Sequence, residues 1–203
     1  MNVFRIPEFL SEREASICYE RVLEREDELM ALGEHNYPSV KGDKLTGRYQ
    51  YYNALEDPVV GPIILPKYHV LFGRGKWFQA WFNAFRKGDR IEPHKHYDTR
   101  DPLQKVMHPF TSCNLYLGGD SSGGTIYEGK TYENHIGELL VFHAGISHWT
   151  EAYEGDDVRV TMATDIHVRK NNPVMIKLKW VLLISSPRKL FVLILVSIRI
   201  TSF

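Results

Sequence analysis

GDRIEPHKHYD (residues 88–98) and GELLVFHAGISHWTEAYEGDDVRVT (residues 137–161) bound the part of the chain that carries the clearest structural signal. Short runs with alternating apolar side chains are separated here by turn sequences rich in glycine and aspartate. Several short strands spaced in this way are typical of antiparallel sandwiches and barrels. The stretch therefore predicts a jelly roll, also called a double-stranded β-helix.

The strands are placed by their period of two. We expect them at Trp77–Phe85, Thr111–Leu117, Thr125–Tyr127, Gly137–Phe142, His148–Tyr153 and Val158–Ile166. One face of the last strand carries Val158, Val160, Met162 and Thr164, and the other carries Arg159, Thr161 and Ala163. Because alternate side chains point to opposite faces of a strand, the first set can pack against helices while the second points into the roll.

A helix is expected to precede the strands. Ser11 and Glu14 fit a capping box, in which the serine side chain accepts from a backbone N–H and the glutamate reaches back. Apolar residues then recur at helical spacing until Gly33. From Tyr37 to Gly75 we expect only short apolar pieces such as Val59–Leu65. The fold class is therefore α+β, mainly β, with an N-terminal helical layer outside the jelly roll.

The C-terminal residues differ in composition from the rest, so we expect one domain over 1–168 and an apolar tail over 169–203. From Lys177 the tail has two apolar runs divided by Pro187-Arg188-Lys189, and each is too short to cross a bilayer. The tail fits two extra strands, an interfacial segment or an addition foreign to the domain. We predict no membrane segment from it.

Composition and charge indicate an ordinary globular protein. Of 203 residues, 43% are hydrophobic and 25% are charged, and 25 basic residues balance 25 acidic ones. Since no basic field is present, we expect no nucleic-acid partner. The first eight residues lack the apolar core of a signal peptide, and Cys18 and Cys113 fit no metal or redox motif. We expect reduced thiols and a cytoplasmic protein.

Candidate metal ligands lie in two separate parts of the chain. His94, His96 and Asp98 fall within five residues, and His148 follows much later. Two imidazoles and one carboxylate on a single face of a metal leave three positions open, which is the arrangement of non-haem Fe(II) oxygenases. These four residues are the predicted metal ligands, and the pattern predicts a mononuclear iron site.

Further polar residues are candidates for binding a second group in the same roll. Arg159 and Thr161 share the inward face of the last strand, and a guanidinium can hold a carboxylate through two parallel hydrogen bonds. Asn114 and Tyr116 lie on a polar face of an earlier strand, and such a face inside a roll is costly unless it lines a cavity or is hydrogen-bonded. We expect all four to contact a dicarboxylate.

The chain resembles the 2-oxoglutarate/Fe(II)-dependent oxygenase superfamily, in particular its prolyl 4-hydroxylase-like and marine-phage-type members. The matching pieces are Gly88-x5-His94, the run Asn114-Leu-Tyr-Leu-Gly-Gly, Gly123-Gly124-Thr125, Gly137-Glu-Leu-Leu-Val-Phe142, His148 and Arg159-x-Thr161. The resemblance implies an Fe(II) cofactor, 2-oxoglutarate and O2 as cosubstrates, and hydroxylation of a C–H bond with release of succinate and CO2. The substrate class stays open between a peptide such as peptidyl proline, a small molecule and a modified macromolecule, and the oligomeric state is left open as well.

Two points stay open at the level of sequence. The superfamily's first pair of ligands is His-x-Asp or His-x-Glu, which His96 and Asp98 supply literally. Counting from Gly88 instead places His94 in the histidine position and His96 in the carboxylate position. The second register also fits the first motif of cupin-type metalloenzymes, which share the fold, and a jelly-roll module that binds without catalysis is a third alternative. Arg159, which a cupin does not require, favours the oxygenase.

Overall fold

The computed structural model describes residues 3–31, 53–73, 75–96, 111–168 and 175–176. Its elements, in chain order, are β1 (Phe4–Ile6), α1 (Glu12–Glu24), α2 (Glu26–Ala31), the short 3-10 helix η1 (Ala54–Glu56), α3 (Val60–Phe72), β2 (Trp77–Phe85), β3 (Thr111–Gly118), β4 (Thr125–Tyr127), β5 (Lys130–Tyr132), β6 (Leu139–His143), β7 (His148–Thr150) and β8 (Arg159–His167). None of the described helices is both long and apolar enough to cross a membrane.

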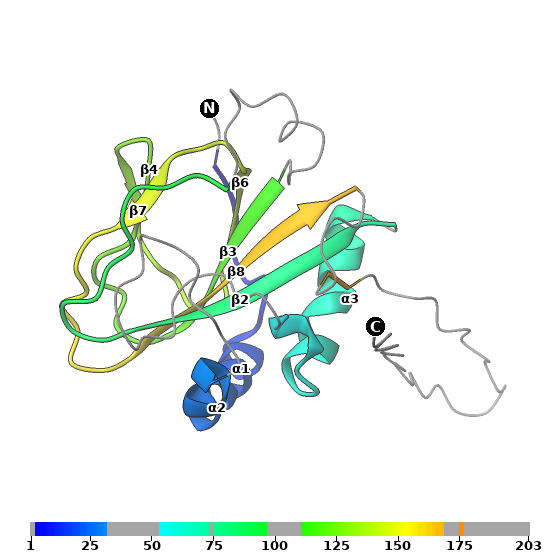
Figure 1. Cartoon of the computed structure of the whole chain (residues 1–203), viewed down its shortest axis with the longest axis horizontal. Coiled ribbons are helices and arrows are strands. Elements are labelled where there is room, and N and C mark those ends of the chain that lie inside the picture. The colour runs from blue at the N-terminus through cyan, green and yellow to red at the C-terminus, as the bar shows by residue number, and fades with distance from the viewer. Residues whose placement is uncertain (1–2, 32–52, 74, 97–110, 169–174, 177–203) are drawn as a thin grey trace, which may run out of the picture.

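Two antiparallel sheets form the body of the protein (Figure 1). The larger has five strands in the order β1-β6-β3-β8-β2, and the smaller has three in the order β5-β4-β7. Because the chain passes back and forth between the two sheets from β3 onward, it builds the jelly roll that the strand pattern predicts. The expected fold class is confirmed.

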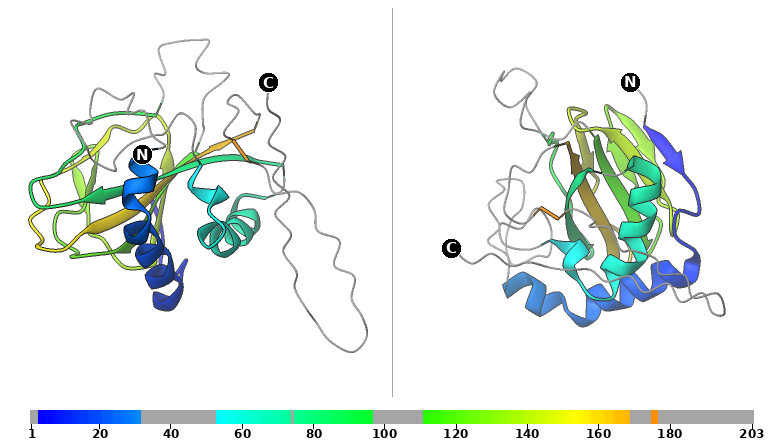
Figure 2. Two further views of the ribbon diagram at one scale, coloured as in Figure 1. Left: turned by 60° about the horizontal axis from the view of Figure 1, so that its bottom comes forward. Right: turned by 90° about the vertical axis from the view of Figure 1, so that its right-hand side faces the viewer.

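The helices cover one face of the larger sheet (Figure 2). Ala15, Cys18 and Val22 of α1 and Ile64, Leu65 and Tyr68 of α3 are buried against residues of β2, β3 and β8 in one hydrophobic core. On β8, Val160 and Met162 belong to this core, and the Thr164 hydroxyl is 3.0 Å from that of Tyr68. The face of β8 that carries Arg159 is thereby left for the inside of the roll, as period-two alternation predicts.

The helical layer differs from the sequence prediction in two places. The predicted N-terminal helix has its capping box at Ser11, but it breaks at Arg25 into α1 and α2. Helix α3 is continuous where the sequence predicts only short apolar pieces, although Pro66 lies inside it and an interior proline removes a hydrogen bond. Burial of its apolar residues in the core outweighs that cost, since tertiary packing supplies most of a helix's stability.

Near each edge of the larger sheet, a further segment makes backbone hydrogen bonds that the sequence pattern does not predict. At one edge, Gly137 has φ +77, and its carbonyl accepts from the Leu10 N–H at 3.0 Å. A Cβ at Gly137 would lie 2.2 Å from the Leu10 carbonyl oxygen, so only glycine fits. At the other edge, Phe78 of β2 forms a bridge with Ile176, within the segment assigned to the tail. Apart from residues 175–176, the tail lies outside the described residues.

Candidate metal and carboxylate site

Three histidines from two distant parts of the chain meet inside the roll. One possible ligand nitrogen from each of His94, His96 and His148 lies within 4.8 Å of the other two. The backbone arranges this meeting, because the N–H of His94 and the N–H of His148 each donate to the other residue's carbonyl at 3.0 Å. The ring of His96 lies beside both, with its centroid 5.5 Å from that of His94 and 4.9 Å from that of His148.

Hydrogen bonds fix which nitrogen two of these rings offer to a metal. The Nδ1 atoms of His94 and His148 lie 2.9 and 3.0 Å from the carbonyl oxygens of Glu92 and Ile146. A carbonyl only accepts, so each Nδ1 carries the proton and Nε2 is the nitrogen with the lone pair. The rings therefore present the tautomer that a metal ligand requires.

Burial keeps the His148 imidazole neutral. It lowers the pKa of His148 to about 3, with the neighbouring His94 acting in the same direction and the Ile146 carbonyl in the opposite one. A metal binds a neutral imidazole in preference to a protonated one. His148 is thus in its ligating form at neutral pH.

Of the two possible registers of the first ligand pair, only the one with His94 and His96 lies within the described residues. The structure brings His94 and His96 together with His148. Asp98, the carboxylate of the other register, lies outside the described residues. The described residues therefore offer a metal three imidazole nitrogens.

Arg159 lies at the start of β8 as a fully buried cation. Its side chain packs over the rings of Phe85 and Tyr153, with the guanidinium carbon 4.2 and 5.1 Å from their centroids. Nη1 donates to the Gly123 carbonyl, whereas Nε and Nη2 have no hydrogen-bond partner among the described residues. Burial lowers the pKa of Arg159 to about 10, so the group is still charged at neutral pH.

The imidazoles and the guanidinium line one cavity. The other described residues of its wall are Trp81, Asn83, Phe85, Ile91, Cys113, Asn114, Thr125, Phe142, Trp149, Thr150, Thr161 and Ala163. No carboxylate is among these described wall residues. The space open to the centres of water molecules is about 60 Å³. The cavity thus holds a fixed positive charge and metal-binding nitrogens, and its described wall has no acidic side chain to balance them.

Of the other three residues predicted to contact a dicarboxylate, two line the cavity and one does not. Thr161 and Asn114 line the cavity, where the Thr161 hydroxyl accepts from Asn83 and the Asn114 amide donates to Thr125, both at 3.2 Å. Tyr116 is not among the lining residues. Its hydroxyl instead donates to the carbonyl oxygens of Gly119 and Asp120, at 2.6 and 2.9 Å, and so holds the turn after β3.

Two residues behind the histidines were not predicted from the sequence. Asp165 is fully buried on β8, and its carboxylate lies 2.5 Å from Nδ1 of His96. Ser112 on β3 donates to the same carboxylate at 2.7 Å. A signal for Asp165 exists, because the inward alternation of β8 that includes Arg159 continues to this residue. The register of β3 against β8 pairs Asp165 with Ser112, and the sequence does not specify that register.

Comparison with known proteins finds solved structures of similar fold. No protein-family model matches the sequence, and no curated protein matches it. The viral collagen prolyl hydroxylase vCPH from Paramecium bursaria Chlorella virus-1, in complex with 2-oxoglutarate, aligns with a TM-score of 0.61 at 12% identity over 83% of this chain and 97% of its own. A Trichoplax adhaerens prolyl hydroxylase, bound to a peptide of hypoxia-inducible factor, aligns at 0.59 and 11% identity over 81% and 83%.

HygX from Streptomyces hygroscopicus, with nickel and 2-oxoglutarate bound, aligns with a TM-score of 0.56 at 13% identity, over 81% of this chain and 82% of its own. At identities this low, the likeness is one of fold. It confirms the double-stranded β-helix and places this chain's fold with that of prolyl hydroxylases and other 2-oxoglutarate oxygenases. Function is argued from the site, because one fold hosts many activities.

Proposed function

We propose that the protein is an Fe(II)- and 2-oxoglutarate-dependent dioxygenase that hydroxylates a C–H bond of its substrate. One oxygen atom of O2 enters the substrate and the other enters succinate, with CO2 released from 2-oxoglutarate. The observation that carries the proposal is a single cavity with metal-binding imidazoles and a buried guanidinium that has partnerless nitrogens among the described residues. A cosubstrate that chelates a metal at one end and carries a carboxylate at the other requires both features in one cavity.

The donor set fits the metal. Imidazole nitrogens suit iron as well as zinc, copper and nickel, and the Nε2 atoms of His94, His96 and His148 would hold the ion. A bound Fe(II) with open coordination positions supplies the redox chemistry by which O2 is activated. The protein orients the cosubstrate and keeps the cavity apolar around it, with Trp81 and Phe142 in its wall.

Charge selects an anionic cosubstrate. A buried arginine without a carboxylate is unfavourable, and the described wall supplies none. A carboxylate of the ligand would accept from Nε and Nη2 of Arg159 in the bidentate geometry that arginine favours. The second carboxylate of 2-oxoglutarate and its keto oxygen are then available to a metal.

The register of the sheet gives the spacing between the two ends of the site. Arg159 is paired with Phe85, whereas Ala163 is paired with Trp81, whose ring centroid lies 5.5 Å from that of His96. Four residues of strand separate the two pairs, which corresponds to about 13 Å. An arginine side chain and a five-carbon dicarboxylate together have the length to span such a gap.

The structural relatives support the same cosubstrate. The vCPH structure is a complex with 2-oxoglutarate, and the HygX structure holds nickel and 2-oxoglutarate. The Trichoplax prolyl hydroxylase holds a peptide, and a peptide or a small molecule is accordingly the proposed substrate class here. The loop 99–110, which we expect to help form the substrate pocket, lies outside the described residues.

A cupin-type metalloenzyme is the second candidate function. It is favoured by the three imidazoles of the described site, two of which come from the first cupin motif. A cupin-type enzyme does not require Arg159. The burial of this arginine without a carboxylate among the described wall residues calls for an anionic ligand. We therefore rank the oxygenase first.

The test is an anaerobic titration of the protein with Fe(II), with and without 2-oxoglutarate, followed by visible absorption. We expect a weak charge-transfer band that requires both components and is absent in Arg159→Ala. Metal binding without that band would favour the cupin-type enzyme. A folded protein that binds no Fe(II) would contradict both and leave the non-catalytic binding module.

A further inference from the structure

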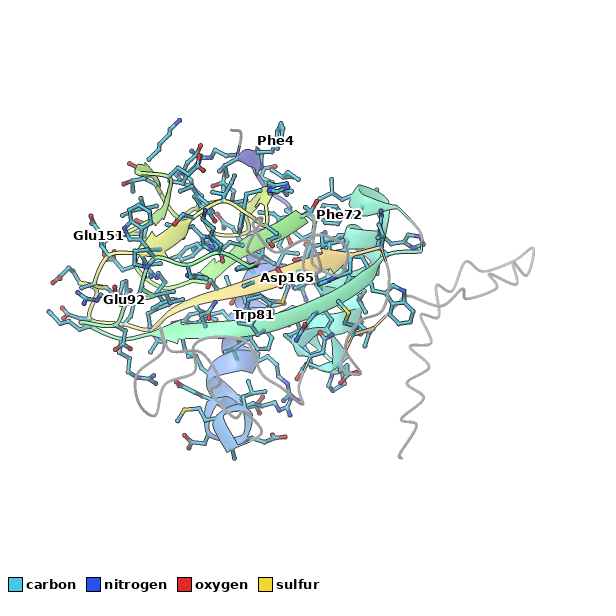
Figure 3. The ribbon with its side chains drawn as sticks, turned by 45° about the horizontal axis from the view of Figure 1, so that its top comes forward. Phe4, Phe72, Trp81, Glu92, Glu151 and Asp165 are labelled. Carbon is cyan, nitrogen blue, oxygen red and sulfur yellow. The ribbon has the colours of Figure 1, made fainter. Side chains whose placement is uncertain are left out.

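A buried carboxylate stands directly behind one of the three histidines. Asp165, on β8, has its carboxylate 2.5 Å from Nδ1 of His96 and 2.7 Å from the Ser112 hydroxyl, which donates to it. The Ser112 oxygen is itself 2.9 Å from Nδ1 of His96. All three residues are buried. Figure 3 shows where Asp165 and Trp81 lie on the neighbouring strands β8 and β2.

We propose that Asp165 is the positioning residue of the metal centre, holding His96 in place for the metal with Ser112 as its own anchor. The proposal rests on the metal-binding part of the proposed function. A carboxylate that accepts from Nδ1–H of a ligating histidine fixes the tautomer and the ring orientation and makes Nε2 a stronger donor. His94 and His148 are held instead by neutral backbone carbonyls, so His96 is set apart among the three.

In the register that counts from Gly88, the position of Asp165 explains how a His-x-His pair can take the place of His-x-Asp. In the superfamily that the chain resembles, the second residue of the pair brings a negative charge to the metal. Here His96 occupies that position beside His94 and His148, and the buried charge lies one hydrogen bond behind it, on Asp165. Burying a carboxylate is costly unless it is hydrogen-bonded, and His96 and Ser112 supply those bonds.

The test is the affinity of the full chain for Co(II), which absorbs in the visible and reports the ligand environment without any turnover. We expect Asp165→Ala to weaken Co(II) binding by about 10- to 100-fold and to change the shape of the absorption bands. Asp165→Asn keeps the shape and an acceptor oxygen but loses the charge, so it should bind Co(II) at least about threefold more weakly than the unchanged protein, though less weakly than Asp165→Ala.

Thr164→Val is the matched control. Thr164 is the buried neighbour of Asp165 on β8, but it faces the helices and bonds to Tyr68, so this variant should lose stability and leave Co(II) affinity unchanged. If either Asp165 variant is folded and binds Co(II) within twofold of the unchanged protein, with the same spectrum, the positioning role is overturned while the metal site stands. If the unchanged, folded protein binds no Co(II), the metal site and the positioning role both fall.

Discussion

Arg159 illustrates at the scale of one residue how function and stability conflict. Its guanidinium is almost fully enclosed, and two of its nitrogens lack a partner among the described residues. Such a group destabilises the ligand-free fold, because a buried charge needs a partner to offset its lost hydration. We expect the same deficit to give affinity for a carboxylate, because such a ligand would supply the missing acceptors.

We therefore expect Arg159→Met to separate the two effects. Methionine fills most of the volume without charge, so the ligand-free variant should be as stable as the unchanged protein or more stable by about 1 kcal/mol. Binding of 2-oxoglutarate should weaken by at least about 30-fold, which corresponds to about 2 kcal/mol. Thermal unfolding and calorimetric titration measure the two quantities. Arg90→Met, at an exposed arginine paired with Glu92, should alter neither. Undiminished binding by Arg159→Met would refute the assigned role.

His148 provides the second prediction at this scale. His148→Ala removes a buried imidazole from the centre of the cluster, so Fe(II)-dependent turnover of 2-oxoglutarate should fall below detection. His135 is exposed and lies outside the cavity, and His135→Ala is the matched control. Succinate formation under O2 measures both. Turnover by the His148 variant at the rate of the control would exclude this residue as a ligand.

At the scale of elements, Asp57 joins the helices that cover the larger sheet. Its carboxylate accepts from the N–H groups of Val59 and Val60 at the start of α3, at 2.8 and 3.1 Å. It also accepts from Arg21 of α1 at 3.2 Å and from Arg25 at the junction of α1 and α2. Burial alone would raise the pKa of Asp57, but these hydrogen bonds and charges outweigh it and the pKa is lowered.

The stability that Asp57 contributes should accordingly depend on pH. Because its pKa is lower in the folded state, the contribution is present above the unfolded value of about 3.9 and is lost as the pH falls through the folded value. Asp57→Asn should destabilise the protein by about 2 kcal/mol at pH 7, and the difference should shrink below about pH 4. Urea unfolding at both pH values measures it. A difference that is constant with pH would show that the carboxylate charge is not the cause.

At the scale of the whole molecule, the site depends on both sheets. His148 comes from β7 of the smaller sheet and Arg159 from β8 of the larger, and both line the same cavity. A ligand that contacts both sheets binds only the folded form, so it stabilises the entire fold by mass action. The tail contributes at least one contact to the same body, through the bridge of Ile176 with Phe78.

We expect metal and 2-oxoglutarate together to raise the unfolding temperature more than the sum of their separate effects. At 100 times the dissociation constant, a ligand adds about 2.7 kcal/mol, which for a chain of this size corresponds to about 5–10 °C. Differential scanning fluorimetry with Ni(II) in place of Fe(II) avoids oxidation during the measurement. Arg159→Met should keep the shift caused by metal and lose the one added by 2-oxoglutarate. If 2-oxoglutarate raised the unfolding temperature of Arg159→Met as much as that of the unchanged protein, a site shared by the metal and Arg159 would be contradicted.

The amino-acid sequence alone predicts those features that depend only on residues close together in the chain. The capping box at Ser11 and the period-two runs of β2, β3 and β8 depend on neighbouring residues, and the sequence predicts them within a few positions. His148 and Arg159 stand out for the same reason, because each follows a recognisable turn in a strand pattern. Alternation is enough to direct Arg159 and Thr161 into the roll.

Contacts between distant segments, in contrast, are set by the tertiary structure. The backbone pairing of His94 with His148 brings three imidazoles together, and the register of β3 against β8 places Ser112 and Asp165 behind His96. Helix α3 forms despite an interior proline, because its apolar face is buried in the core. Local patterns fix the direction of a side chain, but only strand register and burial fix its partner, and the chemistry of this site depends on partners.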